Sequence, residues 1–350
     1  MDLGIRGKKA IVCASSRGLG RGCATALAEA GCDLVVNGRD PKSLSATAAD
    51  IRARFGVEVT EVAGSVSDPK VQAELLRACP SPDILVNNNG GPPRRDFAKH
   101  DRQSILDAVV ENMVTPIELV QAVIGGMAER GFGRIVNITS LSVYVPIPGL
   151  DVSSGARAGL TSFLAGVART VAARNVTINN LLPGKLDTDR LRTTRPSDAD
   201  EAAFKARLAA DIPAGRLGTA EEFGRIVNIT SLSVYVPIPG LDLSSGARAG
   251  LTSFLAGVAR TVADKNVTIN HMLPGKLDTD RLRGPHEAGT VEDPVAGAAR
   301  RARLAADVPA KRLGSPEEFG QVCAFLCSVH AGYLTAQNIP VDGGLYTSAF

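Results

Sequence analysis

The sequence predicts an α/β protein built on a doubly wound parallel sheet, a Rossmann fold. Apolar runs rich in Val, Ile and Leu alternate with amphipathic helical patterns in roughly the first third of the chain. The runs are apolar at nearly every position, which is typical of strands that helices bury on both faces of a parallel sheet. A glycine-containing turn also joins the first run to the first helical pattern, where such sheets bind phosphate groups.

The predicted elements follow one another in a regular strand–helix order. The strands lie over Lys9–Ala14, Asp33–Asn37, Glu58–Ala63 and Ile84–Asn88. The helices lie over Gly18–Ala30, Pro41–Arg54, Pro69–Ala78 and Arg102–Glu129. Each short apolar run is assigned to a strand and each longer amphipathic segment to a helix. Four strands, each followed by a helix, therefore form the first half of the predicted sheet.

The second half of the chain contains a tandem duplication. Arg134–Arg192 recurs as Arg225–Arg283 at an offset of 91 residues, with five of 59 positions changed. The changed pairs are Val152/Leu243, Ala173/Asp264, Arg174/Lys265, Asn180/His271 and Leu181/Met272. Similarity continues between Leu208–Gly224 and Leu304–Gly320, so copy one covers residues 134–224 and copy two residues 225–320.

Removing one copy leaves 350 − 91 = 259 residues, a suitable length for one large α/β domain. We therefore predict a single domain over residues 1–350 in which one copy fills the sheet. The other copy carries an amphipathic helix, Ala156–Ala172 or Ala247–Ala263, that must be covered. It is expected to pack as an extra element or to swap into a second subunit. Only copy two is followed by a last helix, Pro316–Val329, and a last strand, Asn338–Val341.

The composition is that of a soluble globular protein, with 44% hydrophobic and 21% charged residues. A net charge of +3 is too small to indicate a nucleic-acid partner. No apolar run approaches the roughly 20 residues of a membrane span and no signal-peptide pattern is present, so we expect no membrane partner and a cytoplasmic location. The six cysteines lack paired C-x-x-C spacing and the four histidines do not cluster near them, which predicts reduced thiols and no metal site.

The turn after the first predicted strand reads Cys13-Ala14-Ser15-Ser16-Arg17-Gly18-Leu19-Gly20. Glycines let a backbone approach a pyrophosphate closely, and the helix amino terminus offers free N–H groups and a positive dipole end. The alternative is a tight turn that binds no ligand. The incomplete glycine pattern alone does not decide between these two interpretations.

Several motifs resemble those of the short-chain dehydrogenase/reductase family, closest to its β-ketoacyl-acyl-carrier-protein reductase branch. The turn matches T-G-x-x-x-G-x-G with Cys13-Ala14 in place of Thr-Gly, Asn87-Asn88-Asn89-Gly90 matches N-N-A-G, and Val341–Gly344 is V-D-G-G. The resemblance covers essentially all of the 259-residue equivalent. It implies a cofactor site formed by Ala14, Ser16, Arg17, Gly18, Leu19, Gly20, Arg39, Ser65, Val66, Asn88 and Gly90, together with Pro183-Gly184 or Pro274-Gly275.

Charge predicts which dinucleotide this site prefers. The stretch after the second strand reads Val36-Asn37-Gly38-Arg39 and offers no carboxylate for an adenosine ribose 2′-hydroxyl. Arg17 and Arg39 together favour a 2′-phosphate, and hence NADP(H), although either arginine alone is better explained by a solvated surface. Ser65 and Val66 resemble the family's adenine-contacting pair without its usual aspartate.

The resemblance fails at the residues expected to carry the chemistry. In the family, a tyrosine thirteen residues after the active serine is the general acid, and a lysine four residues later holds the nicotinamide ribose and lowers the tyrosine pKa. The matching positions are Asn112 for the helix asparagine, Ser140 or Ser231 for the serine, Ser153 or Ser244 for the tyrosine, and Arg157 or Arg248 for the lysine. A serine hydroxyl is shorter and far less acidic than a phenol, so carbonyl reduction is expected to be slow even where the cofactor binds.

Other side chains are open alternatives for the missing proton donor. Tyr144 and Tyr235 follow the active serines by four residues, and Lys185 and Lys276 follow the P-G pairs. Plain loop packing is the favoured explanation for the two tyrosines, and a solvated surface for the two lysines. Asp187–Asp211 and Asp278–Asp307 resemble the family's mobile substrate loop.

Three functions remain at this stage. The first is an NADP(H)-dependent oxidoreductase that interconverts a ketone and an alcohol, with a small carbonyl compound or a 3-oxoacyl thioester as substrate. The second is a catalytically silent nucleotide-binding or scaffold protein, and the third is a non-redox lyase or isomerase that uses the same pocket. Because the family commonly forms dimers and tetramers, the resemblance also implies a homo-oligomer.

Overall fold

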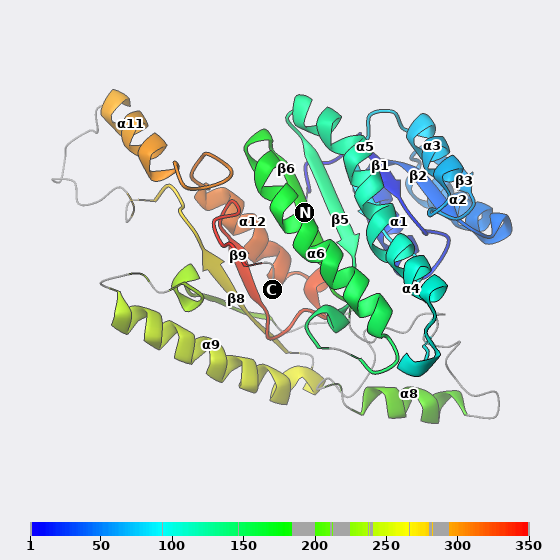
Figure 1. Ribbon diagram of the computed structural model, residues 1–350. Coiled ribbons are helices and arrows are strands. Elements are labelled where there is room, and N and C mark those ends of the chain that lie inside the picture. Colours follow the sequence, from blue (N-terminus) through cyan, green and yellow to red (C-terminus); the bar gives the residue numbers. More distant parts are fainter. Residues whose placement is uncertain are drawn as a thin grey trace. The chain divides into compact units, whose positions relative to one another are not determined.

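The structure is a computed structural model that describes residues 2–92, 94–145, 147–183, 200–210, 212, 225–236, 238, 241–265, 267–279, 282 and 294–348. The chain forms two compact units, which for the most part comprise Met1–Gly184 and Leu191–Ser348. The first unit contains a six-stranded parallel sheet and the second a three-stranded parallel sheet (Figure 1). The predicted α/β Rossmann-like fold is therefore confirmed.

The first unit alternates strands and helices as predicted. Its strands are β1 Lys9–Val12, β2 Asp33–Gly38, β3 Val59–Ala63, β4 Ile84–Asn87, β5 Gly133–Ile138 and β6 Val176–Leu181. Its helices are α1 Gly18–Glu29, α2 Pro41–Phe55, α3 Pro69–Ala78, α4 Arg102–Val109, α5 Thr115–Glu129 and α6 Asp151–Val171. The strand order is β3-β2-β1-β4-β5-β6, so the chain reverses direction across the sheet between β1 and β4. A ligand crevice is expected at that reversal, beyond the carboxyl ends of the strands.

Helices cover both faces of this sheet, and alternate strand residues enter two separate cores. Ala10 and Val12 of β1 pack with α1 and α2, whereas Ile11 between them packs with α3, α5 and α6. This alternation is the two-residue period of a strand applied to a sheet that is buried on both sides. It explains why the strands are apolar at nearly every position.

The second unit contains the last part of copy one, copy two and the end of the chain. Its strands are β7 Arg225–Ile229, β8 Thr268–Pro274 and β9 Asn338–Val341, in the order β7-β8-β9. Its helices are α8 Glu201–Ala209, α9 Asp242–Val262, α11 Pro294–Leu304 and α12 Pro316–Cys327. Met272 of β8 packs against Phe319 and Leu326 of α12 in a small core. Copy one thus supplies β5 and β6 of the larger sheet, and copy two supplies two of the three strands of the smaller one.

Several predicted boundaries move for identifiable reasons. The first strand ends at Val12 rather than Ala14, because Ala14 has a φ of 45°, which no strand residue adopts. The predicted helix Arg102–Glu129 contains a π-helical turn, Val110–Val114, between α4 and α5. The copy-one helix begins at Asp151, five residues before the predicted start, so Ser153 lies within it. Parts of both predicted substrate loops are helical, as α8 and α11, and their middles lie outside the described residues.

The stretch Arg102–Glu129 is long and apolar enough for a membrane span by length and composition, which no other described helix is. Its buried residues nevertheless lie in the core of the first unit, where Leu119, Val123 and Met127 pack with Leu85 of β4 and Ile135 of β5. Core helices of globular units satisfy the same test of length and composition.

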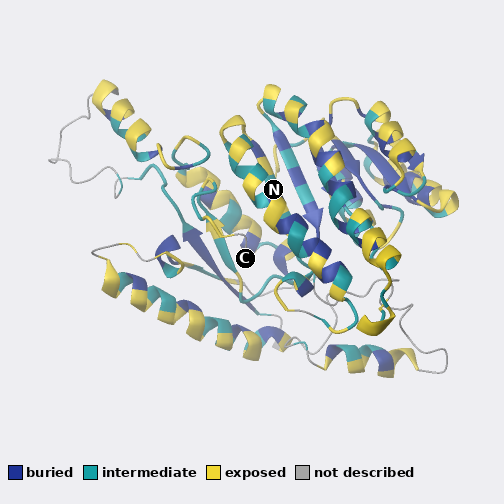
Figure 2. Cartoon of the chain, viewed as in Figure 1, coloured by how far each residue is buried: buried dark blue, intermediate teal, exposed yellow. Residues whose placement is uncertain are grey.

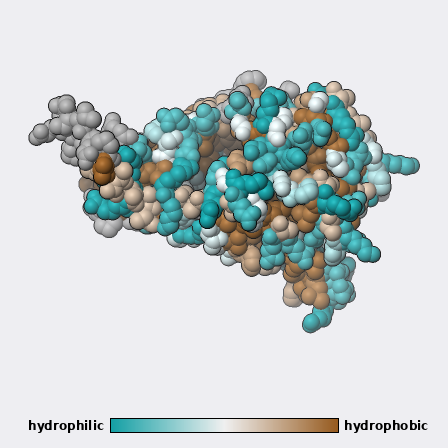
Figure 3. Space-filling view, turned by 90° about the horizontal axis from the view of Figure 1, so that it is seen from above, coloured by the Kyte–Doolittle hydropathy of each residue, from teal (hydrophilic) through white to brown (hydrophobic). Residues whose placement is uncertain are grey.

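Helices α6 and α9 have the same sequence except at Val152/Leu243, yet their surroundings differ (Figure 2). Leu160 of α6 is 3% exposed, whereas the matching Leu251 of α9 is 45% exposed. Phe254 of α9 is also largely exposed, and hydrophobic side chains lie among hydrophilic ones on the face drawn in Figure 3. In the first unit α6 packs against α4, the π turn and α5, which copy two does not duplicate.

Candidate functional site

The turn between β1 and α1 depends on close backbone contacts. Ala14 occupies the left-handed region at φ 45°, where glycine is the favoured residue. Its N–H donates to Asn37 Oδ1 at 3.2 Å, and its carbonyl oxygen accepts from Asn88 Nδ2 at 3.2 Å. A Cβ on Gly20 would lie 2.2 Å from that carbonyl oxygen, so the position accepts only glycine. Gly18 has a φ of 57°, which closes the turn.

The amino terminus of α1 fits a pyrophosphate. Its N-cap residue, Arg17, makes no side-chain capping bond, and the first turn contains no acidic residue. By contrast, Asp40 caps α2 and Asp68 caps α3 through bonds from backbone N–H groups. The first N–H groups of α1 therefore lack the side-chain acceptor that those helices have, and the positive end of the helix dipole is not neutralised locally. A phosphate group supplies both the acceptors and the charge.

Asn37, at the end of β2, belongs to the framework of the turn. Its Nδ2 donates to the carbonyl oxygens of Val62 and Gly64, at 3.0 and 3.1 Å, and the residue is buried. Its backbone N–H donates to Ser15 Oγ at 3.0 Å. The amide thus ties β2 to β3 and to the turn, and no carboxylate stands at this position.

Two arginines flank the turn, as predicted. Arg17 and Arg39 are both exposed. Arg39 Nη2 lies 3.8 Å from the point that a Cβ on Gly90 would occupy, so its side chain reaches across to the loop after β4. A Cβ on Gly38 would lie 2.8 Å from Ser16 Oγ, so glycine lets Ser16 approach the end of β2.

The loop after β4 is held mainly by amide side chains. Asn89 Nδ2 donates to Ser67 Oγ at 2.9 Å and to the Glu111 carbonyl oxygen at 3.1 Å, and Asn89 Oδ1 accepts from the N–H of Gly90 at 2.8 Å.

Of the pair after β3, Val66 is buried in the core, and Ser65 accepts through Oγ from the Ser67 N–H at 3.4 Å. Burial raises the pKa of the Cys13 thiol, which replaces the family's threonine, to about 12.

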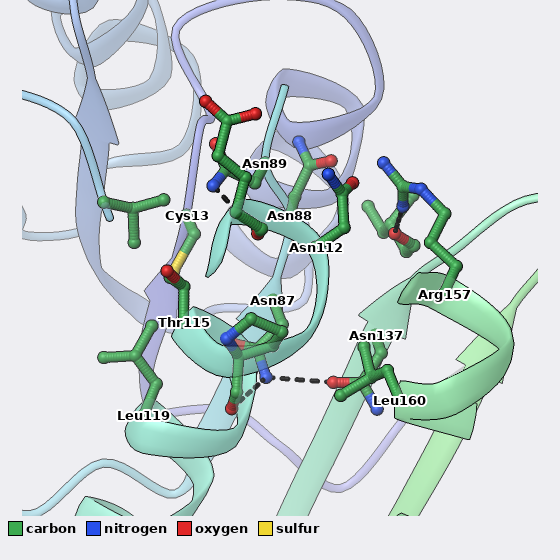
Figure 4. A pocket seen from close by; sticks show the side chains of 14 residues that line it. Cys13, Asn87, Asn88, Asn89, Asn112, Thr115, Leu119, Asn137, Arg157 and Leu160 are labelled. Atoms are coloured by element: carbon green, nitrogen blue, oxygen red, sulfur yellow. Dashed lines mark hydrogen bonds between the residues drawn. The ribbon is translucent and has the colours of Figure 1, made fainter. Parts of the chain in front are cut away.

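A pocket opens between the loop after β4, the π turn and α6 (Figure 4). Asn88, Asn112 and Arg157 line it, so the structure brings together three predicted residues from the loop after β4, the π turn and α6. Asn112 Nδ2 donates to the Ala108 carbonyl oxygen at 3.2 Å, which directs Oδ1 away from that carbonyl. Asn112 Oδ1 is buried without a hydrogen-bond partner, as is Thr115 Oγ1 in the same pocket. The pocket therefore offers buried acceptors to a donor.

A row of three asparagines, which the motifs do not predict, crosses the sheet, and two of its members, Asn87 and Asn137, line the pocket. Asn87 Nδ2 donates to Asn137 Oδ1 at 2.9 Å, and Asn137 Nδ2 donates to Asn180 Oδ1 at 3.1 Å. The three residues stand in register on β4, β5 and β6. An asparagine at the end of each of three apolar strands is the signal that predicts such a row.

The Ser-x-x-x-Arg motif of copy one forms an internal hydrogen-bonded unit. Arg157 Nε donates to Ser153 Oγ at 3.2 Å, and Arg157 Nη1 donates to the carbonyl oxygens of Ile138 and Thr139 at 2.8 and 3.1 Å. Both Ser153 and Arg157 are less than a tenth exposed. The guanidinium thus secures the end of β5 to α6 while it contacts the pocket.

Copy two repeats this unit in the second unit of the structure. Arg248 Nε donates to Ser244 Oγ at 3.2 Å, and Arg248 Nη1 donates to the Thr230 carbonyl oxygen at 2.7 Å. The preceding serines, Ser140 and Ser231, each accept a bond from a backbone N–H two residues on, at 3.1 Å. The same sequence therefore folds alike at both places.

The structure describes only part of the loop after β6 and part of the loop after β8. The Pro183 carbonyl oxygen accepts from the Leu141 N–H, while Gly184 and Lys185 lie outside the described residues. Pro274 pairs with Val341 of β9, and a Cβ on Gly275 would lie 2.6 Å from the Asp342 Cα.

The remaining candidate donors have structural partners in the second unit. Lys276 Nζ lies 2.6 and 2.8 Å from the two carboxylate oxygens of Asp307, and its hydrogen bond lowers the pKa of that carboxyl. The Tyr235 ring stacks on Tyr346 with centroids 4.9 Å apart. In the first unit, Tyr144 is exposed.

All six cysteines are free thiols. Within the described part of the chain, no three or more His, Cys, Asp or Glu side chains are grouped to hold a metal ion.

The sequence profile described as short chain dehydrogenase matches residues 8–199, more than half of the chain. The chain belongs to the short-chain dehydrogenase family. A second profile of this kind, described as enoyl-(acyl carrier protein) reductase, matches residues 220–346. The two matches separate near the junction of the copies, which agrees with the duplication.

Curated relatives include 3-oxoacyl-[acyl-carrier-protein] reductases. The enzyme of Aquifex aeolicus is 30% identical over 65% of this chain and 91% of its own length. That of Pseudomonas aeruginosa is 31% identical over 64% of this chain and 90% of its own length.

Among solved structures, the L-sorbose reductase of Gluconobacter frateurii, in complex with NADPH and L-sorbose, matches with a TM-score of 0.54 and 23% identity. It covers 99% of this chain and 100% of that chain. The similarity to the L-sorbose reductase structure shows a shared fold and nothing further.

Proposed function

We propose that the protein is an NADP(H)-binding short-chain oxidoreductase that acts on a ketone/alcohol pair, with a 3-oxoacyl thioester as the first substrate class to test, and that its proton donation is impaired. The observation that carries the cofactor preference is the combination of exposed Arg17 and Arg39 with the buried amide of Asn37 at the end of β2. Both arginines supply positive charge to a 2′-phosphate, and no carboxylate opposes it there.

NADPH is therefore expected to bind at least about tenfold more tightly than NADH, since one charge-assisted hydrogen bond is worth roughly 1.5–3 kcal/mol. Titration by nicotinamide fluorescence measures both affinities. Arg39→Ala is expected to remove most of the preference, whereas Arg77→Ala, an exposed arginine at the end of α3, leaves it unchanged. Equal affinities of the two cofactors in the unaltered chain would refute this assignment.

The impaired proton donation follows from Ser153 and Arg157. Ser153 is buried at 6% exposure, and its oxygen already accepts a bond from Arg157. An aliphatic hydroxyl is a much weaker acid than a phenol, and a positioned general acid is worth about 10²–10⁴-fold in rate. Slow ketone reduction is expected, and the same observation supports a catalytically silent NADP-binding protein as the second candidate.

Restoring the family's residues tests this part of the proposal. Ser153→Tyr with Arg157→Lys is expected to raise the rate of ketone reduction if copy one lines the working pocket. Ser244→Tyr with Arg248→Lys is the matched change in copy two and raises it instead if copy two does. Rapid reduction by the unaltered chain, unaffected by the serine changes and abolished by Tyr144→Phe, would move the proton donor to the loop and contradict the proposal.

A further inference from the structure

Copy two contains a row of polar side chains, buried His271 between half-buried Asn228 and Asn338, in which several buried atoms make no hydrogen bond. The register places Asn228 of β7 beside His271 of β8, and His271 beside Asn338 of β9. His271 has no exposed surface. Asn228 Nδ2, both ring nitrogens of His271 and Asn338 Oδ1 are buried atoms without a hydrogen-bond partner. A buried polar atom without a hydrogen bond costs folding free energy, so such atoms are rare in native proteins and usually have a specific cause.

Copy one shows what the row does when its members are all amides. There Asn137 Nδ2 donates to Asn180 Oδ1 at 3.1 Å, across the same pair of strands that Asn228 and His271 join in copy two. Asn180/His271 is one of only five differences between the duplicated segments. The change therefore introduces a titratable ring at the centre of an otherwise retained polar row.

The four unpartnered atoms are complementary in one protonation state. Asn228 Nδ2 is a donor and Asn338 Oδ1 an acceptor, and a neutral imidazole carries one acceptor and one donor nitrogen. A neutral ring could therefore accept from Asn228 and donate to Asn338, and that order would fix its tautomer. An imidazolium has two N–H donors and would place one of them against the Asn228 NH₂ group.

We propose that neutral His271 is the central link of an Asn228–His271–Asn338 row, and that its protonation opens the β7–β8–β9 sheet. Copy one has no such device, because Asn180 does not titrate. Opening also releases the turn after β8, since the Gly275 N–H donates to the Val341 carbonyl oxygen of β9. Acid is thus expected to take apart the P-G turn of copy two while that of copy one stays in place.

Among the residues that the structure describes, none supplies a charge that would hold an imidazolium at His271. Side chains alternate along β8, so His271 points to the face opposite Met272, which packs on α12, and β7, β9 and α9 also lie against β8. The charged or titratable groups of these elements are Arg225 on β7, Asp242, Arg248 and Arg260 on α9, and Glu317, Glu318, Cys323 and Cys327 on α12. Just beyond the element ends lie Asp264, Lys265, Lys276 and Asp342. Burial lowers the pKa of His271, and no charged neighbour contributes to that shift.

The direction of the pH effect follows from linkage. A histidine whose folded pKa is lowered binds its proton more readily in the opened state, so stability is present above the unfolded pKa of about 6.5 and falls as the pH drops below it. Each pH unit below that value increases the opening constant by up to about tenfold, until the folded pKa is reached.

Hydrogen exchange on the full chain tests the proposal, because peptides from β6 and β8 differ in sequence and are read separately. Between pH 7.0 and 5.5, after correction for intrinsic exchange rates, β8 amides are expected to lose protection by roughly tenfold while β6 amides keep theirs. His271→Asn, which recreates the row of copy one, is expected to make β8 insensitive to pH. Unchanged β8 protection in the unaltered chain, or an equal loss in the variant, overturns the proposal.

A second measurement needs no variant. With ¹⁵N-labelled histidine, the ring nitrogens of His271 are expected to report one neutral tautomer for as long as β8 remains protected. A His271 ring that is fully protonated while β8 stays protected would show that the sheet tolerates the imidazolium, and the proposed device would not exist.

Discussion

The two nearly identical helices, α6 and α9, allow one leucine to be tested in two surroundings. Leu160 is 3% exposed and lies in the core of the first unit, whereas Leu251, at the same helix position, is 45% exposed. Truncation of each to alanine removes the same atoms from the same local sequence. Any difference in cost therefore reports the surroundings alone.

The expected costs differ by about threefold. Three carbon groups are worth about 2.4 kcal/mol of transfer free energy when fully buried, and the cavity left in a packed core raises the cost of Leu160→Ala to about 3 kcal/mol. Only about half of the Leu251 side-chain surface is buried, so its truncation removes about half of that transfer free energy and leaves no closed cavity. Alanine is also the better helix former, so Leu251→Ala is expected to cost about 1 kcal/mol.

Scanning calorimetry measures both changes. For units of this size, 1 kcal/mol moves Tm by about 2–4 °C, so Leu160→Ala is expected to lower the transition of the first unit by about 6–12 °C and Leu251→Ala that of the second unit by about 2–4 °C. Double substitution should give both shifts independently. Equal shifts for the two variants would refute the reasoning, because they would mean that α9 is covered in solution as fully as α6.

Three further outcomes are expected. Ala14→Gly should stabilise the chain by up to about 1 kcal/mol, because glycine removes the strain of the left-handed φ of 45° and this gain exceeds the extra conformational entropy of glycine in the unfolded chain. A lower Tm would contradict this. Deletion of residues 134–224 should leave a folded chain of 350 − 91 = 259 residues by circular dichroism, with altered assembly by light scattering, and an unfolded product would show that copy one is indispensable. Iodoacetamide at neutral pH should label exposed Cys327 and spare Cys13, whose thiol pKa is raised to about 12; rapid labelling of Cys13 would count against its burial.

The order of elements from β1 to α5 follows from the sequence because each element is determined locally. Apolar runs and amphipathic segments place the boundaries within a few residues, and the exceptions have local causes such as the φ of Ala14. The pairing of the duplicated strands is different. Arg134–Ile138 and Arg225–Ile229 are identical in sequence, so no local property distinguishes the strand that pairs with β4 from the strand that does not.

The candidate site divides in the same way. Motif spacing predicts that Asn88, Asn112 and Arg157 belong together, and they line one pocket. Motif spacing does not predict that the Asn37 side-chain amide donates to the carbonyl oxygens of Val62 and Gly64, because these residues belong to β3 and the turn after it, which are distant in sequence. Nor does it predict that Arg157 turns toward the end of β5.

The contacts of Arg157 have an evolutionary consequence. A lysine at this position has a single nitrogen and cannot serve Ser153 and two carbonyl groups with the planar fork of a guanidinium. A tyrosine at position 153 alone would have to displace a buried bond within a packed helix. Each change by itself is therefore expected to destabilise the chain before any catalytic gain is realised. Evolution toward the tyrosine and lysine that the family resemblance implies would require both changes together, or a prior loosening of the β5 end.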